Sequence, residues 1–178
     1  MRVTGGTLKG RIIKCPDGII RPAMDKMKES VFSILGDITN KSFLDLFSGS
    51  GSIAIEASSR GAHPVTLVEK DKIKITTVLD NVSMTENKIN CKFMACELFI
   101  KRNKQQFNYI FCDPPFPYQF HQDLVKQCAL TNALTDDGIL MIHHPAEKKL
   151  DEKIANLIRY DQRFFGRSIV DFYKKNLD

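Results

Sequence analysis

The sequence predicts an α/β fold in which a mostly parallel sheet carries helices on both faces. Three observations favour this fold. Short apolar segments alternate with amphipathic ones from residue 42 onward, and the apolar segments are almost uninterrupted, as in strands that are buried on both faces. The chain has 178 residues, which fits one domain, and its 43% hydrophobic and 26% charged residues are typical of globular proteins.

The N-terminal part is expected to form a basic extension of the main domain. Residues 2–15 suit a short hairpin that a pair of glycines interrupts. An Arg-Pro pair at 21–22 ends an extended segment, because the residue before proline avoids the helical region. Apolar residues then recur from Met24 at helical spacing, which predicts a helix that ends near Gly36. The predicted parts are therefore an extension, residues 1–40, and a main domain, residues 41–178.

The remaining elements are expected to alternate between strand and helix. Apolar runs predict five strands, at residues 42–47, 65–69, 91–95, 109–112 and 138–143. Helical spacing predicts five helices, at residues 52–60, 71–84, 97–103, 119–130 and 150–157. Residues 163–165 and 169–173 look like a closing hairpin around Gly166, which would add one antiparallel strand at the end of the sheet.

Basic residues are concentrated at the two ends of the chain. Residues 1–28 hold seven basic and two acidic side chains, residues 148–178 hold eight and five, and the middle holds eleven and fourteen. A basic end on an otherwise acidic body suits a polyanionic partner that binds at one face. A solvated surface with a chance excess of basic residues fits the same numbers.

The composition argues against a membrane, secreted or metal-binding protein. The longest apolar runs are far shorter than the ~18 residues of a membrane span, and the first residues lack the apolar centre of a secretory signal. Five cysteines, none in a C-x-x-C pair, favour free thiols in a reducing cytoplasm over disulfides or zinc. His143 and His144 have no carboxylate or cysteine at ligand spacing, so we expect no metal.

A glycine-rich turn follows the first strand of the main domain. Gly49 and Gly51 stand where this strand runs into a helix, and glycines there let a ligand approach the backbone at the helix N-terminus. With Glu69 at the end of the next strand, twenty residues after Gly49, the pattern also fits the dinucleotide fingerprint. Glu69 can accept from a ribose hydroxyl of NAD or of S-adenosylmethionine, so the turn and Glu69 are compatible with both cofactors.

Asp45 distinguishes between these two cofactors. It lies four residues before Gly49, so we expect its carboxylate in the same crevice. A carboxylate repels a pyrophosphate, whereas it attracts the ammonium and sulfonium groups of S-adenosylmethionine. The sequence therefore favours S-adenosylmethionine, and a turn-capping role is the alternative for Asp45.

The fourth strand of the main domain ends in the tetrad Asp113-Pro114-Pro115-Phe116. The prolines fix the backbone at the carboxyl end of a strand, where α/β sheets bind ligands. The Asp113 carboxylate and the Pro114 carbonyl can accept the two hydrogens of a planar exocyclic amine, and Phe116 can stack on an extruded base. The tetrad predicts methyl transfer to a base amine, which needs positioning more than a strong base. A rigid turn is the alternative interpretation of the two prolines.

Five blocks of the sequence together carry a resemblance to a known family. The blocks are Arg2-Val3-Thr4-Gly5-Gly6-x-x-Lys9-Gly10-Arg11, Arg21-Pro22-x-x-Asp25-x-x-Lys28-Glu29-Ser30-x-Phe32, Leu44-Asp45-Leu46-Phe47-Ser48-Gly49-Ser50-Gly51, Glu56-Ala57-x-Ser59-Arg60-Gly61-Ala62 and Asp113-Pro114-Pro115-Phe116. They are similar to the bacterial 16S ribosomal RNA guanine-N2 methyltransferases (RsmD type), a family of class I S-adenosylmethionine-dependent enzymes. The resemblance runs through nearly the whole chain. The tetrad is shared with adenine and glutamine methyltransferases, and the N-terminal blocks are the specific part.

The resemblance implies a Rossmann-like, seven-stranded, mostly parallel sheet and methylation of a guanine N2 amine in 16S ribosomal RNA. The partner would be that RNA or a small-subunit assembly particle, and we expect a cytoplasmic monomer without a metal or a membrane contact. The implied catalytic residues are Asp113, Pro114, Pro115 and Phe116. The implied cofactor-binding residues are Asp45, Phe47, Gly49, Gly51, Glu69, Lys70, Ala95, Cys96 and Arg21. The implied RNA-binding residues are Arg2, Lys9, Arg11 and Arg21.

Two positions depart from the family pattern. Ala95 or Cys96 stands where an acidic or amide side chain commonly contacts adenine, so backbone groups or Glu97 would read the adenine. His143 stands where an acidic residue often follows the fifth strand. The alternatives are a DNA adenine-N6 methyltransferase, which would share the tetrad but need a target-recognition domain, an RNA-binding assembly factor with weakened catalysis, and an NAD-dependent dehydrogenase, which Asp45 disfavours.

Overall fold

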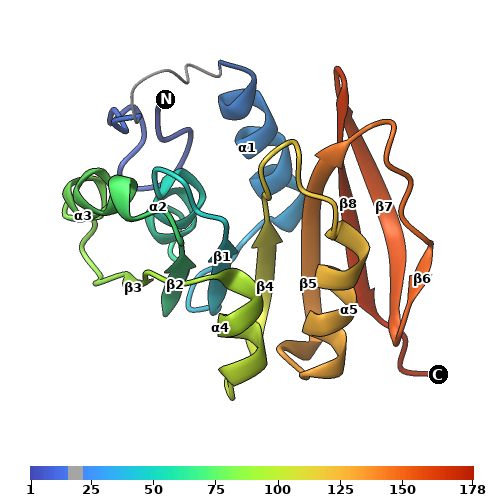
Figure 1. Cartoon of the computed structure of the whole chain (residues 1–178). Coiled ribbons are helices and arrows are strands. Elements are labelled where there is room, and N and C mark those ends of the chain that lie inside the picture. The colour runs from blue at the N-terminus through green and yellow to red at the C-terminus, as the bar shows by residue number, and fades with distance from the viewer. Residues whose placement is uncertain (16–21) are drawn as a thin grey trace.

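An eight-stranded sheet runs through the computed structural model, which describes residues 1–15 and 22–178 (Figure 1). The strands are β1 (Phe43–Leu46), β2 (Val65–Val68), β3 (Asn90–Lys92), β4 (Phe107–Cys112), β5 (Leu134–Pro145), β6 (Lys153–Ile154), β7 (Leu157–Phe165) and β8 (Ser168–Lys175). Their order in the sheet is β3-β2-β1-β4-β5-β8-β7-β6. The first five are parallel to one another, and β8, β7 and β6 continue the sheet with antiparallel pairing.

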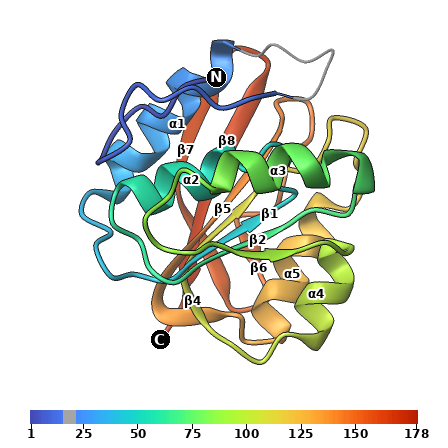
Figure 2. The same ribbon diagram turned by 90° about the vertical axis from the view of Figure 1, so that its left-hand side faces the viewer.

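Helices cover both faces of the sheet. They are α1 (Pro22–Leu35), α2 (Ser52–Ser59), α3 (Ile75–Val82) with the short 3-10 helix η1 (Lys72–Lys74) before it, α4 (Cys96–Arg102) and α5 (His121–Leu130). Figure 2 shows α1, α2 and α3 on one side of the sheet and α4 and α5 on the other. Among the described residues, no helix is both long enough and apolar enough to cross a membrane.

Successive residues of the central strands pack into two hydrophobic clusters, one on each face of the sheet. Phe43 of β1 packs with the cluster that includes α1, α2 and α3, and its ring stacks on Phe32 with the centroids 5.7 Å apart. Leu44, the next residue, packs with the cluster that includes α4 and α5. Strands buried on both faces account for the nearly uninterrupted apolar runs. The predicted α/β class with a parallel sheet between two helical layers is therefore confirmed.

The structure corrects the helix that was expected at residues 150–157. Residues Lys153–Ile154 form β6, the chain turns at Ala155 with a φ of 52°, and β7 begins at Leu157. Ile154 and Leu157 are paired across this tight turn, and both side chains are buried in the same cluster. A two-residue turn thus places residues three apart on one face, which imitates helical spacing. The additional strand makes the sheet eight-stranded instead of seven-stranded.

A buried ionic cluster fastens the N-terminal segment to α2. The expected hairpin is reduced to one isolated antiparallel bridge between Arg2 and Ile12. Glu56 of α2 is fully buried, and its carboxylate accepts from the backbone N–H groups of Thr4 and Gly5 at 2.9 Å each. The Lys28 ammonium, which is also fully buried, lies 3.6 Å from the same carboxylate. Because breaking a buried ion pair leaves an uncompensated charge, this cluster fixes where the N-terminal segment lies.

Candidate active site

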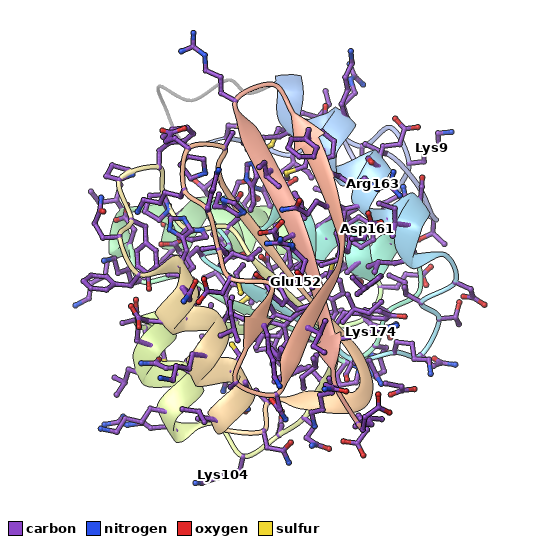
Figure 3. The ribbon with its side chains drawn as sticks, turned by 90° about the vertical axis from the view of Figure 1, so that its right-hand side faces the viewer. Lys9, Lys104, Glu152, Asp161, Arg163 and Lys174 are labelled. Atoms are coloured by element: carbon purple, nitrogen blue, oxygen red, sulfur yellow. The ribbon has the colours of Figure 1, made fainter. Side chains whose placement is uncertain are left out.

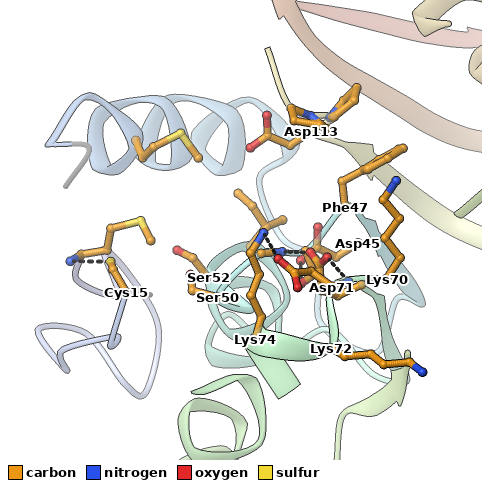
Figure 4. Close-up of a pocket in the computed structure, with 18 residues that line it drawn as sticks. Cys15, Asp45, Phe47, Ser50, Ser52, Lys70, Asp71, Lys72, Lys74 and Asp113 are labelled. Atoms are coloured by element: carbon orange, nitrogen blue, oxygen red, sulfur yellow. Dashed lines mark hydrogen bonds and ion pairs between the residues drawn. The ribbon is translucent and has the colours of Figure 1, made fainter. Parts of the chain in front are cut away.

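A pocket of about 590 Å³ lies at the carboxyl ends of β1, β2 and β4 (Figure 4). The loops after these three strands form most of its wall, and the N-terminal segment and α1 complete it. The pocket brings the predicted glycine-rich turn after β1 together with the loop after β4 that carries the tetrad at residues 113–116, which we call the catalytic loop. The lining residues are Met1, Cys15, Met24, Asp45, Phe47, Ser48, Gly49, Ser50, Ser52, Ile53, Glu69, Lys70, Asp71, Lys72, Lys74, Asp113, Pro114 and Pro115.

The loop after β1 contains three residues in the left-handed backbone region. Phe47, Gly49 and Gly51 have φ values of 59°, 61° and 86°. Glycine adopts such values freely, whereas at Phe47 the surrounding contacts must hold the backbone in place. The Phe47 N–H donates to the Cys96 thiol sulfur at 3.2 Å, and Cys96 is buried beneath the loop, outside the pocket lining. The structure therefore places Cys96 as a support of the loop.

Asp45 presents a carboxylate oxygen that has no partner. Its side chain is only 1% exposed, and one oxygen, Oδ2, accepts from the Ser48 hydroxyl at 2.6 Å and from the Ala54 N–H at 3.1 Å. The other oxygen, Oδ1, is buried without a hydrogen-bond partner among the described residues. Burial, together with the nearby charges of Asp113 and Glu69, raises the pKa of Asp45 to about 7 against the hydrogen bonds from Ser48 and Ala54. A cationic ligand group would satisfy this oxygen and favour the ionised form.

Glu69 connects the carboxyl end of β2 to the glycine-rich loop. Its Oε2 accepts from the Gly49 N–H at 2.7 Å, and its Oε1 accepts from the Asp71 N–H at 2.9 Å. Each carboxylate oxygen has two lone pairs, so Glu69 can hold the loop and still accept from a hydroxyl of a bound ligand. Lys70 follows it and also lines the pocket.

The Asp113 carboxylate is held by His143, a residue for which the sequence alone indicated no role in the site. His143 Nδ1 lies 2.8 Å from Asp113 Oδ1, and His143 Nε2 lies 2.8 Å from the Ser168 hydroxyl. The register of β4 and β5 explains the contact, because Cys112 pairs with Ile142 and the next residue on each strand lies at the same edge. A signal was present in the sequence: the predicted strands at residues 109–112 and 138–143 each carry a polar, ionisable residue at their end or directly after it.

An aromatic wall adjoins the pocket on the side of α4. The Tyr118 ring meets the Phe47 ring edge to face, with the centroids 5.1 Å apart. Its hydroxyl donates to Glu97 Oε1 at 2.6 Å, and burial together with this carboxylate raises the pKa of Tyr118. Glu97, one of the expected contacts of adenine, therefore already has a partner. Phe116 is 52% exposed and lies outside the pocket lining.

The remaining predicted residues lie in several places. Gly51 and Ala95 are outside the pocket lining, and Ala95 caps the start of α4. Lys9 and Arg11 are exposed on the N-terminal segment, and the Arg2 guanidinium donates to the Gly10 carbonyl at 3.2 Å. Arg21 lies outside the described residues.

The sequence matches a protein-family model along nearly its full length. The model of the family described as Conserved hypothetical protein 95 matches residues 1–174. A candidate rRNA methyltransferase of Bacillus subtilis (strain 168), YlbH, is 34% identical over 183 residues, which cover 98% of this chain and 99% of that protein. Ribosomal RNA small subunit methyltransferase D of Escherichia coli (strain K12) is 26% identical over 181 residues, which cover 98% and 90%.

Solved structures share the fold. A candidate methyltransferase of Escherichia coli, yhhF, superposes with a TM-score of 0.89 at 26% identity and covers 100% of this chain and 99% of its own. SMU.776, a candidate methyltransferase whose structure contains SAH, superposes with a TM-score of 0.72 at 17% identity over 89% of this chain and 51% of that one. At that identity, the second likeness shows the fold alone.

Proposed function

Because this chain belongs to the family described as Conserved hypothetical protein 95, we propose that it is an S-adenosylmethionine-dependent methyltransferase of ribosomal RNA. The names of the Bacillus subtilis and Escherichia coli relatives, which match almost the whole chain, support this class of substrate. Within it, we propose that the acceptor is the exocyclic N2 amine of a guanine in 16S ribosomal RNA.

One observation carries the assignment of the cofactor: among the described residues, three of the four carboxylates that line the pocket have no lysine or arginine partner, whereas the fourth, Asp71, pairs with Lys74. The three are Asp45, Glu69 and Asp113, which face the pocket from the ends of β1, β2 and β4. Among the described residues, neither Asp45 nor Glu69 forms an ion pair, and Asp45 keeps an unpartnered buried oxygen. Lys70, Lys72 and Lys74 also line the pocket, and they follow β2. Beside Asp45, an ammonium or sulfonium group is favoured, whereas the pyrophosphate of a dinucleotide would be repelled. The pocket therefore fits S-adenosylmethionine better than NAD.

The chemistry assigned to the loop after β4 is the capture and deprotonation of a base amine. When bound, S-adenosylmethionine supplies an electrophilic methyl group on a sulfonium. Asp113 and the Pro114 carbonyl accept the two amine hydrogens, which orients the nitrogen lone pair toward the cofactor side of the pocket. The methyl–sulfur bond would break as the nitrogen–carbon bond forms, and its electron pair would stay on sulfur as a neutral thioether. The Asp113 carboxylate would stabilise the positive charge that develops on the amine nitrogen and take up the proton that leaves.

The proposed RNA contacts surround the same edge of the sheet. Phe116 exposes its ring beside the catalytic loop, where an extruded base can stack on it. Met1 and Cys15 line the pocket, so the segment that carries Arg2, Lys9 and Arg11 starts and ends beside it. Basic side chains there suit phosphate groups on either side of the target base.

The experiment that tests the proposal is methyl transfer with radiolabelled S-adenosylmethionine, followed by mass spectrometry of the nucleosides. Naked 16S ribosomal RNA, small-subunit particles and duplex DNA are offered in separate reactions, and Asp113→Ala serves as the control with strongly reduced transfer. We expect N2-methylguanosine from one of the RNA substrates. N6-methyladenine from DNA would favour the alternative DNA methyltransferase, and RNA binding without any product would favour the assembly factor.

A further inference from the structure

Three side chains from three parts of the sheet form a chain that ends at the catalytic loop. Asp113 follows β4, His143 belongs to β5 and Ser168 begins β8. His143 connects the other two, with each ring nitrogen 2.8 Å from its partner oxygen. The imidazole is 13% exposed and the Asp113 carboxylate 20% exposed, so the contact is shielded from most competing water.

The two oxygens of Asp113 have different surroundings. Oδ1 is engaged by His143, whereas Oδ2 has no hydrogen-bond partner among the described residues. Asp113 lines the pocket, so the free oxygen remains available to a substrate amine. An aspartate bound only through its backbone would rotate about two side-chain bonds, and a bond to one oxygen removes that freedom.

The far side of the imidazole is fixed as well. The Ser168 hydroxyl lies 2.8 Å from His143 Nε2 and 3.1 Å from the Phe165 carbonyl oxygen, and a hydroxyl can donate or accept at Nε2 while Nδ1 donates to the Asp113 carboxylate. The strand register supports this arrangement, because His143 lies opposite Val170, and Ser168 lies opposite Pro145 two residues further along β5. The ring is thus held at both nitrogens by rigid elements of the sheet.

We propose that His143 is a positioning residue that presents the Asp113 carboxylate to the base amine. The inference rests on the proposed function and adds to it a residue that does not touch the substrate. Its effect belongs to the transition state, because the aspartate must accept an amine hydrogen in one narrow geometry while the methyl group is transferred. A residue that only stabilised the fold would change neither this geometry nor its dependence on Asp113.

The first test compares His143→Leu with His143→Asn in single-turnover methyl transfer to the RNA substrate. Leucine removes the donor and nearly conserves the volume, so kcat should fall by about 10- to 100-fold, with the Kd of S-adenosylmethionine and the KM of the RNA within twofold of wild type. Asparagine places an N–H donor near the position of Nδ1 and should recover most of that loss. Unchanged kcat in His143→Leu, or equal losses in both variants, would overturn the proposal.

A matched control and a double-mutant cycle separate positioning from stability. His144, the next residue of β5, forms a buried 2.8 Å contact with Asp171 that does not reach the pocket. His144→Leu should lower the Tm and leave kcat unchanged at a temperature where the protein is folded. Adding His143→Leu to Asp113→Ala should cost no further activity, because the two residues act as a unit. Additive losses would mean that His143 acts elsewhere.

A spectroscopic measurement tests the contacts without catalysis, so it is decisive even if the RNA substrate proves to be different. Nitrogen NMR of the free protein should show that Asp113→Ala shifts Nδ1 of His143 and that Ser168→Ala shifts Nε2. If neither resonance moves, the chain of contacts is absent and the proposal fails. An inactive wild-type protein with both shifts present would instead contradict the proposed function alone.

Discussion

Gly49 donates its backbone N–H to Glu69 at 2.7 Å, so the carboxylate at the end of β2 holds the glycine-rich loop that follows β1. The second oxygen of Glu69 accepts from the backbone of Asp71. One side chain thereby fixes two loops that line the pocket. Such preorganisation lowers the cost of ordering the site when the cofactor binds.

Replacing Glu69 by glutamine should weaken the binding of S-adenosylmethionine. An amide offers one acceptor where the carboxylate offers two, so its NH₂ would face a backbone N–H. We expect a loss of ~1–3 kcal/mol in calorimetric affinity, the range for a charge-assisted hydrogen bond. Glu152→Gln, at an exposed position on the far edge of the sheet (Figure 3), is the matched control and should bind normally. Equal affinities in the two variants would remove Glu69 from the cofactor site.

The buried carboxyl of Asp45 should make cofactor binding depend on pH. Burial raises its pKa to about 7 in the free protein, so the carboxyl is increasingly protonated below that pH. A cationic ligand prefers the ionised form, so calorimetric affinity should rise from pH 6 to pH 8 and approach a tenfold change per pH unit below about 7. Asp45→Asn should bind more weakly and should remove most of this pH dependence. A wild-type affinity that does not change with pH would contradict the assignment.

The Asp45 carboxyl should also make the stability of the fold depend on pH, and here a rise in pH should lower the free energy of unfolding. A carboxyl whose folded pKa lies above its ordinary value of 3.8 binds its proton more tightly in the folded state. It contributes stability that is fully present below the unfolded pKa and is lost as pH rises through about 7. The free energy of unfolding, measured in urea without ligand, should therefore fall in wild type relative to Asp45→Asn as the pH rises from 5 to 8. A constant difference across this range would exclude the pKa of about 7.

Much of the fold could be predicted because helical and strand periodicity are local properties of a chain. The apolar runs of β1 and β2 and the helical spacing of α1 are visible in a few neighbouring residues. The prediction of a helix at residues 150–157 was wrong for the same reason, since a tight turn between β6 and β7 reproduces helical spacing at Ile154 and Leu157. Only the pairing of the two strands separates these alternatives, and pairing depends on the rest of the sheet.

Contacts between strands account for what the sequence could not show of the site. Asp45, Glu69 and Asp113 could be placed at one edge because each follows a predicted strand, and parallel strands end at one edge. The contact of Asp113 with His143 depends on β5 lying directly beside β4. Nothing in the spacing of residues 113 and 143 indicates a distance of 2.8 Å.

Removing positive charge from the N-terminal segment should weaken the salt dependence of RNA binding. Each phosphate contact adds about 0.7–0.9 to the slope of log K against log salt, so replacing Arg2, Lys9 and Arg11 by alanine should flatten it by ~2–3. The control replaces Lys101, Arg102 and Lys104 by alanine, which removes the same positive charge from a distant part of the surface. Figure 3 shows Lys9 and Lys104 at opposite ends of the molecule. Equal slopes in the two triple variants would place the RNA elsewhere, with Arg163, Arg167, Lys174 and Lys175 as the next candidates.

Phe116 should contribute to capture of the base instead of the chemical step. Its half-exposed ring has room for a stacked base, and stacking on an aromatic side chain contributes ~1–3 kcal/mol. Phe116→Ala should raise the KM of the RNA by this amount with kcat nearly unchanged, as measured by steady-state methyl transfer. Phe116→Tyr, which retains a flat ring, should behave like wild type. If alanine and tyrosine were equivalent, stacking would not be the role of this residue.

Asp113 should act on the chemical step itself. Its carboxylate strengthens its bond to the amine as positive charge develops on nitrogen, so the interaction belongs to the transition state more than to the bound substrate. We expect Asp113→Ala to lower kcat by at least ~100-fold, the effect of losing one preorganised electrostatic partner.

The affinity of Asp113→Ala for S-adenosylmethionine should change much less than that of Asp45→Ala, because the unpartnered buried oxygen that suits the cofactor's cation belongs to Asp45. Single-turnover transfer with cofactor affinity measured in parallel makes the comparison. Transfer by Asp113→Ala at nearly the wild-type rate would remove the tetrad from the mechanism and favour the assembly factor.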